Sequence, residues 1–148
     1  MALTLGGLAH ISARLSYSGR KDLFLSAVNR RGWEDDEGCR YCIFPGGAGT
    51  GFGLPPEVDF VVVDVMGELR PHRHVHTDVV LTAHLPDGEG AAEAFIEGNG
   101  WLPIVDGQVF PIPRGEIHGF RNRAGGAKRL ILLNVESPPL ADDDTEYV

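Results

Sequence analysis

The sequence has no long stretch free of glycine and proline, and it has no long hydrophobic run. Its 148 residues include 20 glycines and 10 prolines, about a fifth of the chain against a typical share of roughly 12%. The longest stretch without either residue, 72–85, has 14 residues, too few for the long helices of a helical bundle. Because a membrane-spanning helix needs about 20 consecutive apolar residues, we also expect no membrane partner.

Positive charge is scarce as well. Lysine and arginine number 13 against 21 aspartates and glutamates, which gives a formal net charge of −8. A nucleic-acid partner is not expected, because binding to phosphates requires a basic surface. Eight acidic residues form two clusters, at 34–37 and 142–146, and the remaining chain has 13 acidic and 13 basic residues. We interpret the first cluster as a solvated turn and the second as part of an acidic, flexible tail over 137–148.

Only two cysteines are present, Cys39 and Cys42, in the segment Cys-Arg-Tyr-Cys. No second pair completes a structural zinc site, and the flanking residues predict a strand rather than the helix start that a redox pair uses. Residues three apart on a strand point to opposite faces, so we expect two reduced, structural cysteines. The N-terminus lacks the basic region of a signal peptide, and we expect a cytoplasmic protein.

Short β-branched and apolar segments alternate with turns along most of the chain. The strongest is Val-Asp-Phe-Val-Val-Val-Asp-Val-Met at 58–66. Further strands are expected at 22–28, 40–44, 78–85, 94–97, 101–105, 108–112, 118–121 and 130–135. Residues 1–20 contain enough glycine and serine to predict an arm rather than a firm helix. The pattern predicts one all-β domain, a barrel or a sandwich, with an N-terminal arm and first strands over 1–57, a barrel over 58–136 and the tail over 137–148.

Histidines gather in the middle of the chain. Five of the six fall between residues 72 and 118, and three alternate in Pro-His-Arg-His-Val-His-Thr-Asp at 71–78. On a single strand, the side chains of His72, His74, His76 and Asp78 would project from one face. Neutral imidazole and carboxylate are good ligands for divalent first-row metals. The pattern therefore favours a metal site over a solvated loop with incidental histidines.

A second segment, 107–122, carries a specific motif. It fits G-x5-P-x-G-x2-H-x3-N at every fixed position, which are Gly107, Pro113, Gly115, His118 and Asn122. This segment resembles the second signature motif of the cupin superfamily. Residues 67–85 resemble the first cupin motif, G-x5-H-x-H-x3-4-E-x6-G, with one residue fewer after Gly67, with Asp78 in place of glutamate and with Leu85 in place of the closing glycine.

The resemblance implies a small antiparallel β-barrel of the cupin or jelly-roll type that binds one divalent transition metal, Fe(II), Mn(II), Ni(II) or Zn(II). Carried over position by position, it implies four metal ligands, which are His72, His74, Asp78 and His118. His76 replaces Asp78 if the strand register shifts by two residues. Cupins commonly dimerise through N-terminal strands, so the resemblance also implies a homodimer.

Strand parity from Asp78 and His118 predicts the lining of a substrate pocket. Its expected residues are Val80, Thr82, Phe120 and Asn122. His84 shares the parity of Asp78, and a neutral imidazole near pH 7 can take or give a proton. His84 and His76 are therefore the candidate catalytic residues, with a structural role in a backbone hydrogen bond as the alternative for His84.

These features favour a metal-dependent enzyme that acts on a small oxygenated or carbonyl-bearing metabolite. Its most concrete form is a non-haem dioxygenase, in which the metal binds the substrate through two oxygens. The alternatives are a redox-neutral lyase, decarboxylase, isomerase or cyclase, and a non-catalytic module that binds a metabolite or a sugar.

Overall fold

The structure, a computed structural model, describes residues 3–18, 32–36, 38–47, 54–141 and 143–148. These residues form one helix and eleven strands. They are α1 (Leu5–Ser18), β1 (Glu34–Asp36), β2 (Cys39–Phe44), β3 (Asp59–Val65), β4 (Glu68–His74), β5 (Asp78–His84), β6 (Ala92–Ile96), β7 (Gly100–Pro103), β8 (Val109–Ile112), β9 (His118–Asn122), β10 (Ile131–Ser137) and β11 (Thr145–Tyr147).

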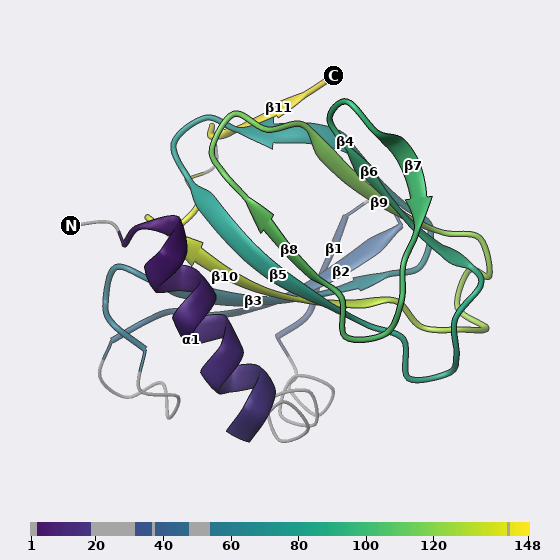
Figure 1. Cartoon of the computed structure of the whole chain (residues 1–148), viewed down its shortest axis with the longest axis horizontal. Coiled ribbons are helices and arrows are strands. Elements are labelled where there is room, and N and C mark those ends of the chain that lie inside the picture. The colour runs from purple at the N-terminus through teal and green to yellow at the C-terminus, as the bar shows by residue number, and fades with distance from the viewer. Residues whose placement is uncertain (1–2, 19–31, 37, 48–53, 142) are drawn as a thin grey trace.

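The strands form two antiparallel sheets that pack face to face (Figure 1). The six-stranded sheet has the order β1-β2-β3-β10-β5-β8, and the five-stranded sheet has the order β11-β4-β9-β6-β7. Strands distant in sequence are neighbours in both sheets, because β10 lies between β3 and β5, and β9 lies between β4 and β6. The prediction of an all-β jelly-roll architecture is confirmed.

The central strands of the six-stranded sheet, β3, β10 and β5, are buried on both faces. On β3, Val61, Val63 and Val65 belong to the core between the two sheets, whereas Phe60 and Val62 belong to a second core on the outer face. This arrangement explains why β3 is an almost continuous run of β-branched residues instead of an alternating one.

Helix α1 packs on the outer face of the six-stranded sheet, against β5, β10 and β8 (Figure 1). Its Leu8 side chain is fully buried in the outer core, and the hydroxyl of Ser12 lies 3.4 Å from that of Thr82 on β5. The Thr4 hydroxyl accepts a hydrogen bond from the Gly7 amide and so caps the first turn. The expectation of an arm over 1–20 was wrong for residues 5–18, because packing on the sheet outweighs the low helix propensity of glycine and serine.

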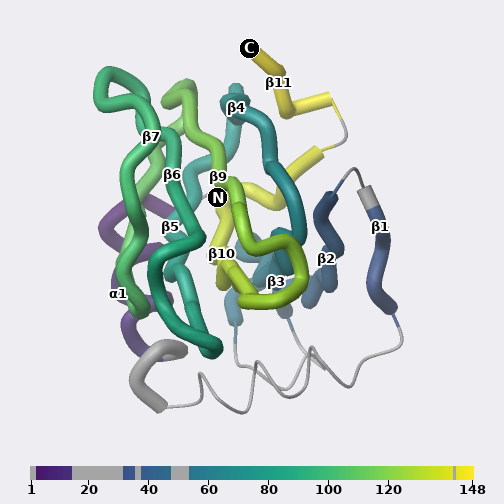
Figure 2. Tube along the Cα trace, turned by 90° about the vertical axis from the view of Figure 1, so that its right-hand side faces the viewer, coloured from purple at the N-terminus to yellow at the C-terminus, as the bar shows by residue number. Residues whose placement is uncertain are grey.

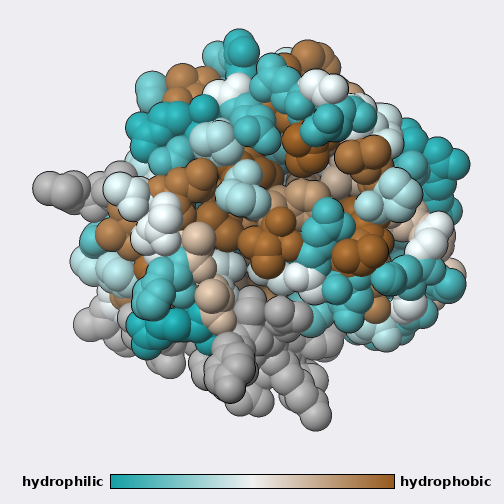
Figure 3. Space-filling model, viewed as in Figure 1, coloured by the Kyte–Doolittle hydropathy of each residue, from teal (hydrophilic) through white to brown (hydrophobic). Residues whose placement is uncertain are grey.

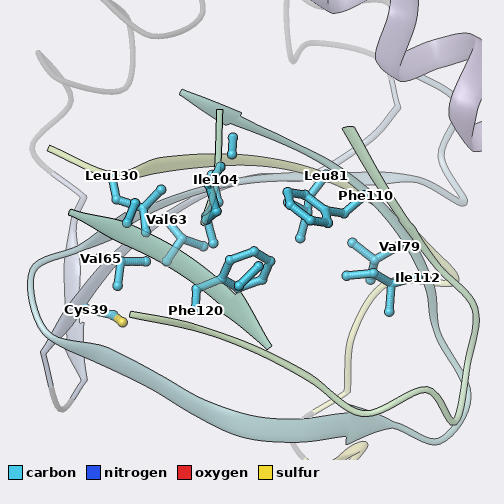
Figure 4. Packing of buried hydrophobic residues seen from close by; sticks show 14 of the residues in the cluster. Cys39, Val63, Val65, Val79, Leu81, Ile104, Phe110, Ile112, Phe120 and Leu130 are labelled. Atoms are coloured by element: carbon cyan, nitrogen blue, oxygen red, sulfur yellow. The ribbon is translucent and has the colours of Figure 1, made fainter. Parts of the chain in front are cut away.

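The inner core packs between the two sheets (Figure 4). Phe120 on β9 and Phe110 on β8 meet edge to face, with ring centroids 5.6 Å apart and planes at 82°. Aliphatic side chains from β3, β5 and β10 surround them. The site described below adjoins this core and is lined by both polar and apolar side chains.

Most of the predicted strands occur within a few residues of their expected bounds. The expected strand at 22–28 lies outside the described residues. The histidine segment is not one strand, because β4 ends at His74, the chain bends at 75–77, and β5 begins at Asp78 in the other sheet. The segment after 137 differs from the flexible tail that we expected, since Thr145–Tyr147 pairs with β4 as β11 (Figure 2). Glu34–Asp36, expected as a turn, is strand β1.

Two glycines of the second motif stand at tight turns, as expected. Gly107 has φ 81° and Gly115 has φ 85°, a conformation that L-residues with side chains rarely adopt. Cys39 and Cys42 form no disulfide and are both buried, one in the inner core and one in the outer core. Among the described residues, no helix has the length and apolar character that a membrane crossing needs.

Candidate metal centre

Three histidines converge between the sheets. His72 and His118 are directly opposite each other on β4 and β9, and His74 follows two residues later on the same face of β4. The ring centroid of His118 lies 4.3 Å from that of His72 and 5.1 Å from that of His74, and one ring nitrogen of each residue lies within 4.8 Å of the others. All three are buried, with exposed fractions of 3–8%. We call His72, His74 and His118 the histidine cluster.

Irregular pairing between β4 and β9 shapes the cluster. The register shifts between Leu69 and His72, and Pro71, which has no amide hydrogen to donate, lies inside this irregularity. A Cβ atom at Gly119 would lie 3.0 Å from the Leu69 carbonyl oxygen, so a side chain there would force β9 and β4 slightly apart. His118 is thereby held against His72.

Burial keeps the three imidazoles neutral. Together with the smaller effect of the neighbouring His72, it lowers the pKa of His118 to about 3 and that of His74 to about 4. The pKa of His72 is also lowered by burial. Neutral imidazole is the form that offers a lone pair to a metal ion.

Hydrogen bonds at Nδ1 leave the other ring nitrogens available. His72 Nδ1 lies 2.6 Å from the Arg70 carbonyl oxygen, and His118 Nδ1 lies 3.0 Å from the Glu116 carbonyl oxygen. His74 Nδ1 lies 3.3 Å from the Thr145 hydroxyl. A carbonyl oxygen only accepts, so Nδ1 of His72 and His118 carries the proton and Nε2 carries the lone pair. These residues fit a metal ion, and the histidine cluster could hold one through Nε2.

A pocket of about 380 Å³ opens beside the cluster. His72 and His74 form part of its wall, and apolar residues of β2, β3 and β4 form another part, which are Tyr41, Ile43, Val61, Val63 and Leu69. The C-terminal segment contributes Leu140, Ala141, Thr145 and Tyr147. The volume suits a small molecule.

Two carboxyl groups and an amide complete the pocket wall. Asp59 and Glu136 are directly opposite on β3 and β10, and Asn134 lies two residues before Glu136 on the same face. Burial, and then the charge of Asp59, raise the pKa of Glu136 to about 8, although a hydrogen bond from Asn134 opposes the shift. Burial also raises the pKa of Asp59. Oε2 of Glu136 and Oδ1 of Asn134 are buried and have no hydrogen-bond partner among the described residues.

Asp78, expected as the fourth ligand, is not brought to the histidine cluster. Its carboxylate accepts hydrogen bonds from the Arg114 amide at 2.8 Å and from the Arg114 guanidinium at 3.2 Å. The bend at 75–77 places Asp78 at the start of β5, in the sheet opposite β4, so the assumed common face does not exist.

The two expected catalytic histidines lie away from the cluster as well. His76 is exposed in the bend, where its amide donates to the Asp144 carboxylate at 2.7 Å. His84 ends β5, and its Nδ1 lies 3.5 Å from the Asp106 carboxylate, at the opposite end of the strand from Asp78. Neither residue lines the pocket.

The residues that we expected to line the pocket do not line it. Val80 packs in the outer core, and Thr82 faces α1 through Ser12, because β5 presents Val79 and Leu81 to the inner core instead. Phe120 does face inward and lies behind His118, with ring centroids 6.5 Å apart, but it belongs to the core.

Asn122 has a structural role. Its amide nitrogen donates to the carbonyl oxygens of Val65, Gly125 and Lys128, and its Oδ1 accepts from the Ala124 amide. These bonds fix the turn between β9 and β10, so the asparagine of the second motif stabilises the barrel and does not line the pocket.

The sequence reasoning missed Asp59, Asn134 and Glu136. A signal was present in 130–136, where polar Asn134 and Glu136 alternate with apolar residues in an otherwise apolar strand. Alternation places both side chains on one face, and a carboxyl group within a buried strand is uncommon unless it has a function.

No protein-family model and no curated protein matches the sequence. Solved structures do match. KdgF from Halomonas sp. is 24% identical with a TM-score of 0.55, over 75% of this chain and 90% of KdgF. Pac13 from Streptomyces, described as a nucleoside dehydratase, is 12% identical with a TM-score of 0.55, over 78% of this chain and 82% of Pac13.

A third match is Rru_A2000 from Rhodospirillum rubrum, described as a cupin-2 domain. It is 16% identical with a TM-score of 0.57, and the match covers 81% of this chain and 78% of that protein. At these identities the likeness concerns the fold. The chain has the cupin fold, with a buried cluster of three histidines that could bind one metal ion.

Proposed function

We propose that this chain is a metal-dependent enzyme that transfers protons, without net oxidation or reduction, on a small substrate with hydroxyl or carbonyl oxygens. The observation that carries the proposal is Glu136, a fully buried carboxyl group that shares the pocket with the histidine cluster. A carboxyl group with a pKa near 8 is suited to acid–base catalysis at neutral pH.

His72, His74 and His118 are the residues that would hold the metal. Three neutral imidazoles suit Fe(II), Mn(II), Ni(II) and Zn(II), and they leave coordination positions for a substrate. The ion would supply Lewis-acid polarisation of a substrate carbonyl.

The carboxyl pair supports two complementary roles. Glu136, the more deeply buried, carries a proton at pH 7 and acts as the acid, whereas the half-buried Asp59 is the better proton acceptor. In an elimination from a β-hydroxy carbonyl compound, Asp59 takes the proton from the carbon beside the carbonyl. The carbon–oxygen bond to the hydroxyl group breaks, Glu136 gives its proton to the departing oxygen, and water and a carbon–carbon double bond result. Pac13, which shares the fold, is described as a nucleoside dehydratase, so this fold accommodates such chemistry.

A non-haem dioxygenase is the second candidate. The three-histidine donor set supports it, because imidazole also suits iron that reacts with oxygen. Buried Glu136 beside half-buried Asp59 favours proton transfer, since oxygen insertion has no need of an acid with a raised pKa.

The test follows proton transfer directly. Wild-type protein loaded with Co²⁺ or Fe²⁺ under anaerobic conditions is incubated in D₂O with a panel of β-hydroxy carbonyl compounds and sugars, and NMR follows deuterium incorporation and loss of water. We expect exchange or elimination without oxygen and a decrease of roughly 10²–10⁴-fold in Glu136→Gln. The matched control is Glu89→Gln, which changes an exposed glutamate and should keep the wild-type rate.

Other results contradict the proposal in distinct ways. Turnover that requires oxygen and consumes it would identify the dioxygenase. Compounds that bind but neither exchange nor react would indicate a non-catalytic binding module.

A further inference from the structure

One histidine of the cluster is held differently from the other two. Nδ1 of His72 and Nδ1 of His118 each bond to the backbone carbonyl two residues earlier in the chain. Nδ1 of His74 instead lies 3.3 Å from the hydroxyl of Thr145, a residue 71 positions later. The orientation of His74 thus depends on a side chain from the C-terminal segment.

Strand pairing places Thr145 at this point. β11 runs antiparallel to β4 with Thr145 opposite His74, Glu146 opposite Arg73 and Tyr147 opposite His72. Alternation turns Thr145 and Tyr147 toward the pocket, and both line it. It turns Glu146 outward, where its carboxylate binds Arg73 at 2.8 Å with both side chains about half exposed.

The segment before and after β11 is anchored to β4 and the bend. The Asp144 side chain is 2% exposed, and its carboxylate accepts from the His76 amide at 2.7 Å. The Val75 amide donates to the Asp144 carbonyl at 3.0 Å, and the Val148 amide donates to the Pro71 carbonyl at 3.2 Å. The guanidinium of Arg70 stacks on the Tyr147 ring at 4.3 Å.

We propose that Thr145 is a positioning residue that fixes the tautomer and the orientation of His74, so that the metal site is complete only when β11 is paired with β4. The inference rests on the proposed function, because it concerns the same metal site. The threonine oxygen accepts the Nδ1 proton of His74, which leaves the lone pair on Nε2, as in the other two histidines.

Removal of the hydroxyl tests this role. Valine has nearly the shape of threonine but no acceptor, so Thr145→Val leaves a buried Nδ1–H group without its partner. Loss of such an outer hydrogen bond to a metal-binding histidine typically weakens metal affinity about 10–100-fold. Thr145→Ser keeps the hydroxyl and should bind metal within about 3-fold of wild type.

The measurement is Co²⁺ affinity, determined by competition with a chromophoric chelator. We expect a 10–100-fold loss in Thr145→Val and near wild-type affinity in Thr145→Ser. Glu146→Gln is the matched control on the same strand, because it changes only the outward ion pair, and it should stay within about 2-fold.

A second readout needs no metal. Nitrogen-15 NMR of the imidazoles in the metal-free protein reports the tautomer of His74, and we expect a defined Nδ1–H form in wild type and a tautomer mixture in Thr145→Val. Equal affinity and an unchanged tautomer in Thr145→Val would overturn the inference, as would an equal loss in Thr145→Ser. A wild-type protein that binds no Co²⁺ would overturn the proposed function, and this inference with it.

Discussion

Burial acts in opposite directions on the pKa values of two groups in the site, but it favours the uncharged form of each. It lowers the pKa of His118 to about 3 and raises the pKa of Glu136 to about 8. At neutral pH and without metal, the deepest side chains of the site are therefore uncharged. The hydrogen-bonding capacity that they retain is available to a metal ion or a substrate.

This property makes stability depend on pH in a defined way. The pKa of Glu136 in the folded protein is about 8, against an ordinary value of 4.5, so its favourable contribution is present below about pH 4.5 and is lost as the pH rises toward 8. His118 and His74 affect stability in the acidic range. Their favourable contribution to stability is present above about pH 6.5 and is lost as the pH falls toward 4 for His74 and toward 3 for His118.

Glu136→Gln should remove the alkaline part of this dependence. In metal-free protein we expect the variant and wild type to have similar free energies of unfolding at pH 4.5. At pH 9 the variant should be more stable by roughly a few kcal/mol, because wild type must then bury a carboxylate. Urea titrations across this range check the result, with Glu89→Gln as the control. A constant difference at every pH would show that Glu136 does not titrate as argued.

At the scale of elements, the helix and the site are on opposite faces of one sheet. α1 packs on the outer face through Leu8, whereas the pocket is on the inner face. The two faces share strands β3 and β10 but have separate cores. A substitution in the outer core should therefore change the stability of the fold without changing metal affinity.

Leu8→Ala tests this separation. The side chain is fully buried, so the substitution should lower the free energy of unfolding by about 2–5 kcal/mol. Co²⁺ affinity should stay within about 2-fold of wild type, because no ligand contacts the outer core. A large loss of affinity in a protein that is still folded would contradict the independence of the two faces.

Elements that a local sequence pattern determines could be predicted well. Features that depend on pairing between distant segments could not. Segment 58–66 has strong β propensity, and β3 forms there. The prediction of which β5 side chains face the pocket was wrong by one residue. Residues 79–83 are all buried, so their hydrophobicity does not show which of them face the inner core. The assumed parity came from Asp78, which the bend separates from the histidines.

The C-terminal strand carried no local signal either. β11 is three residues long and follows acidic residues, and its partner β4 lies about 70 residues earlier. Likewise the second motif identified His118 and the fold, but the pocket acids depend on the pairing of β3 with β10. The three histidines of the cluster could be predicted because each lies in a local motif, whereas Asp59 and Glu136 belong to no motif.

At the scale of the whole molecule, metal binding by the histidine cluster would be coupled to folding. A ligand that binds only the folded state adds about 2.7 kcal/mol of stability at 100 times its Kd. For a chain of this length that corresponds to a rise in Tm of roughly 5–10 °C.

Addition of Ni²⁺ or Co²⁺ to chelator-treated protein should therefore raise its Tm, and a chelator should reverse the rise. His118→Ala should fold but show no rise, whereas His84→Ala, which changes a residue outside the cluster, should behave as wild type. Calorimetry or circular dichroism measures the shift. An equal rise in His118→Ala would place the metal elsewhere.

The homodimer implied by the cupin resemblance stays a prediction. The surface carries apolar side chains among polar ones (Figure 3), and Leu102, Val105 and Val109 are large and about half exposed.

The two cysteines offer a further consequence of the layered core. Cys39 is buried in the inner core and Cys42 in the outer core, although only two residues separate them. A thiol reagent can reach the first only when the two sheets separate and the second only when the outer core opens. Their rates of alkylation, resolved by mass spectrometry, would therefore time the opening of each layer separately from a single sample.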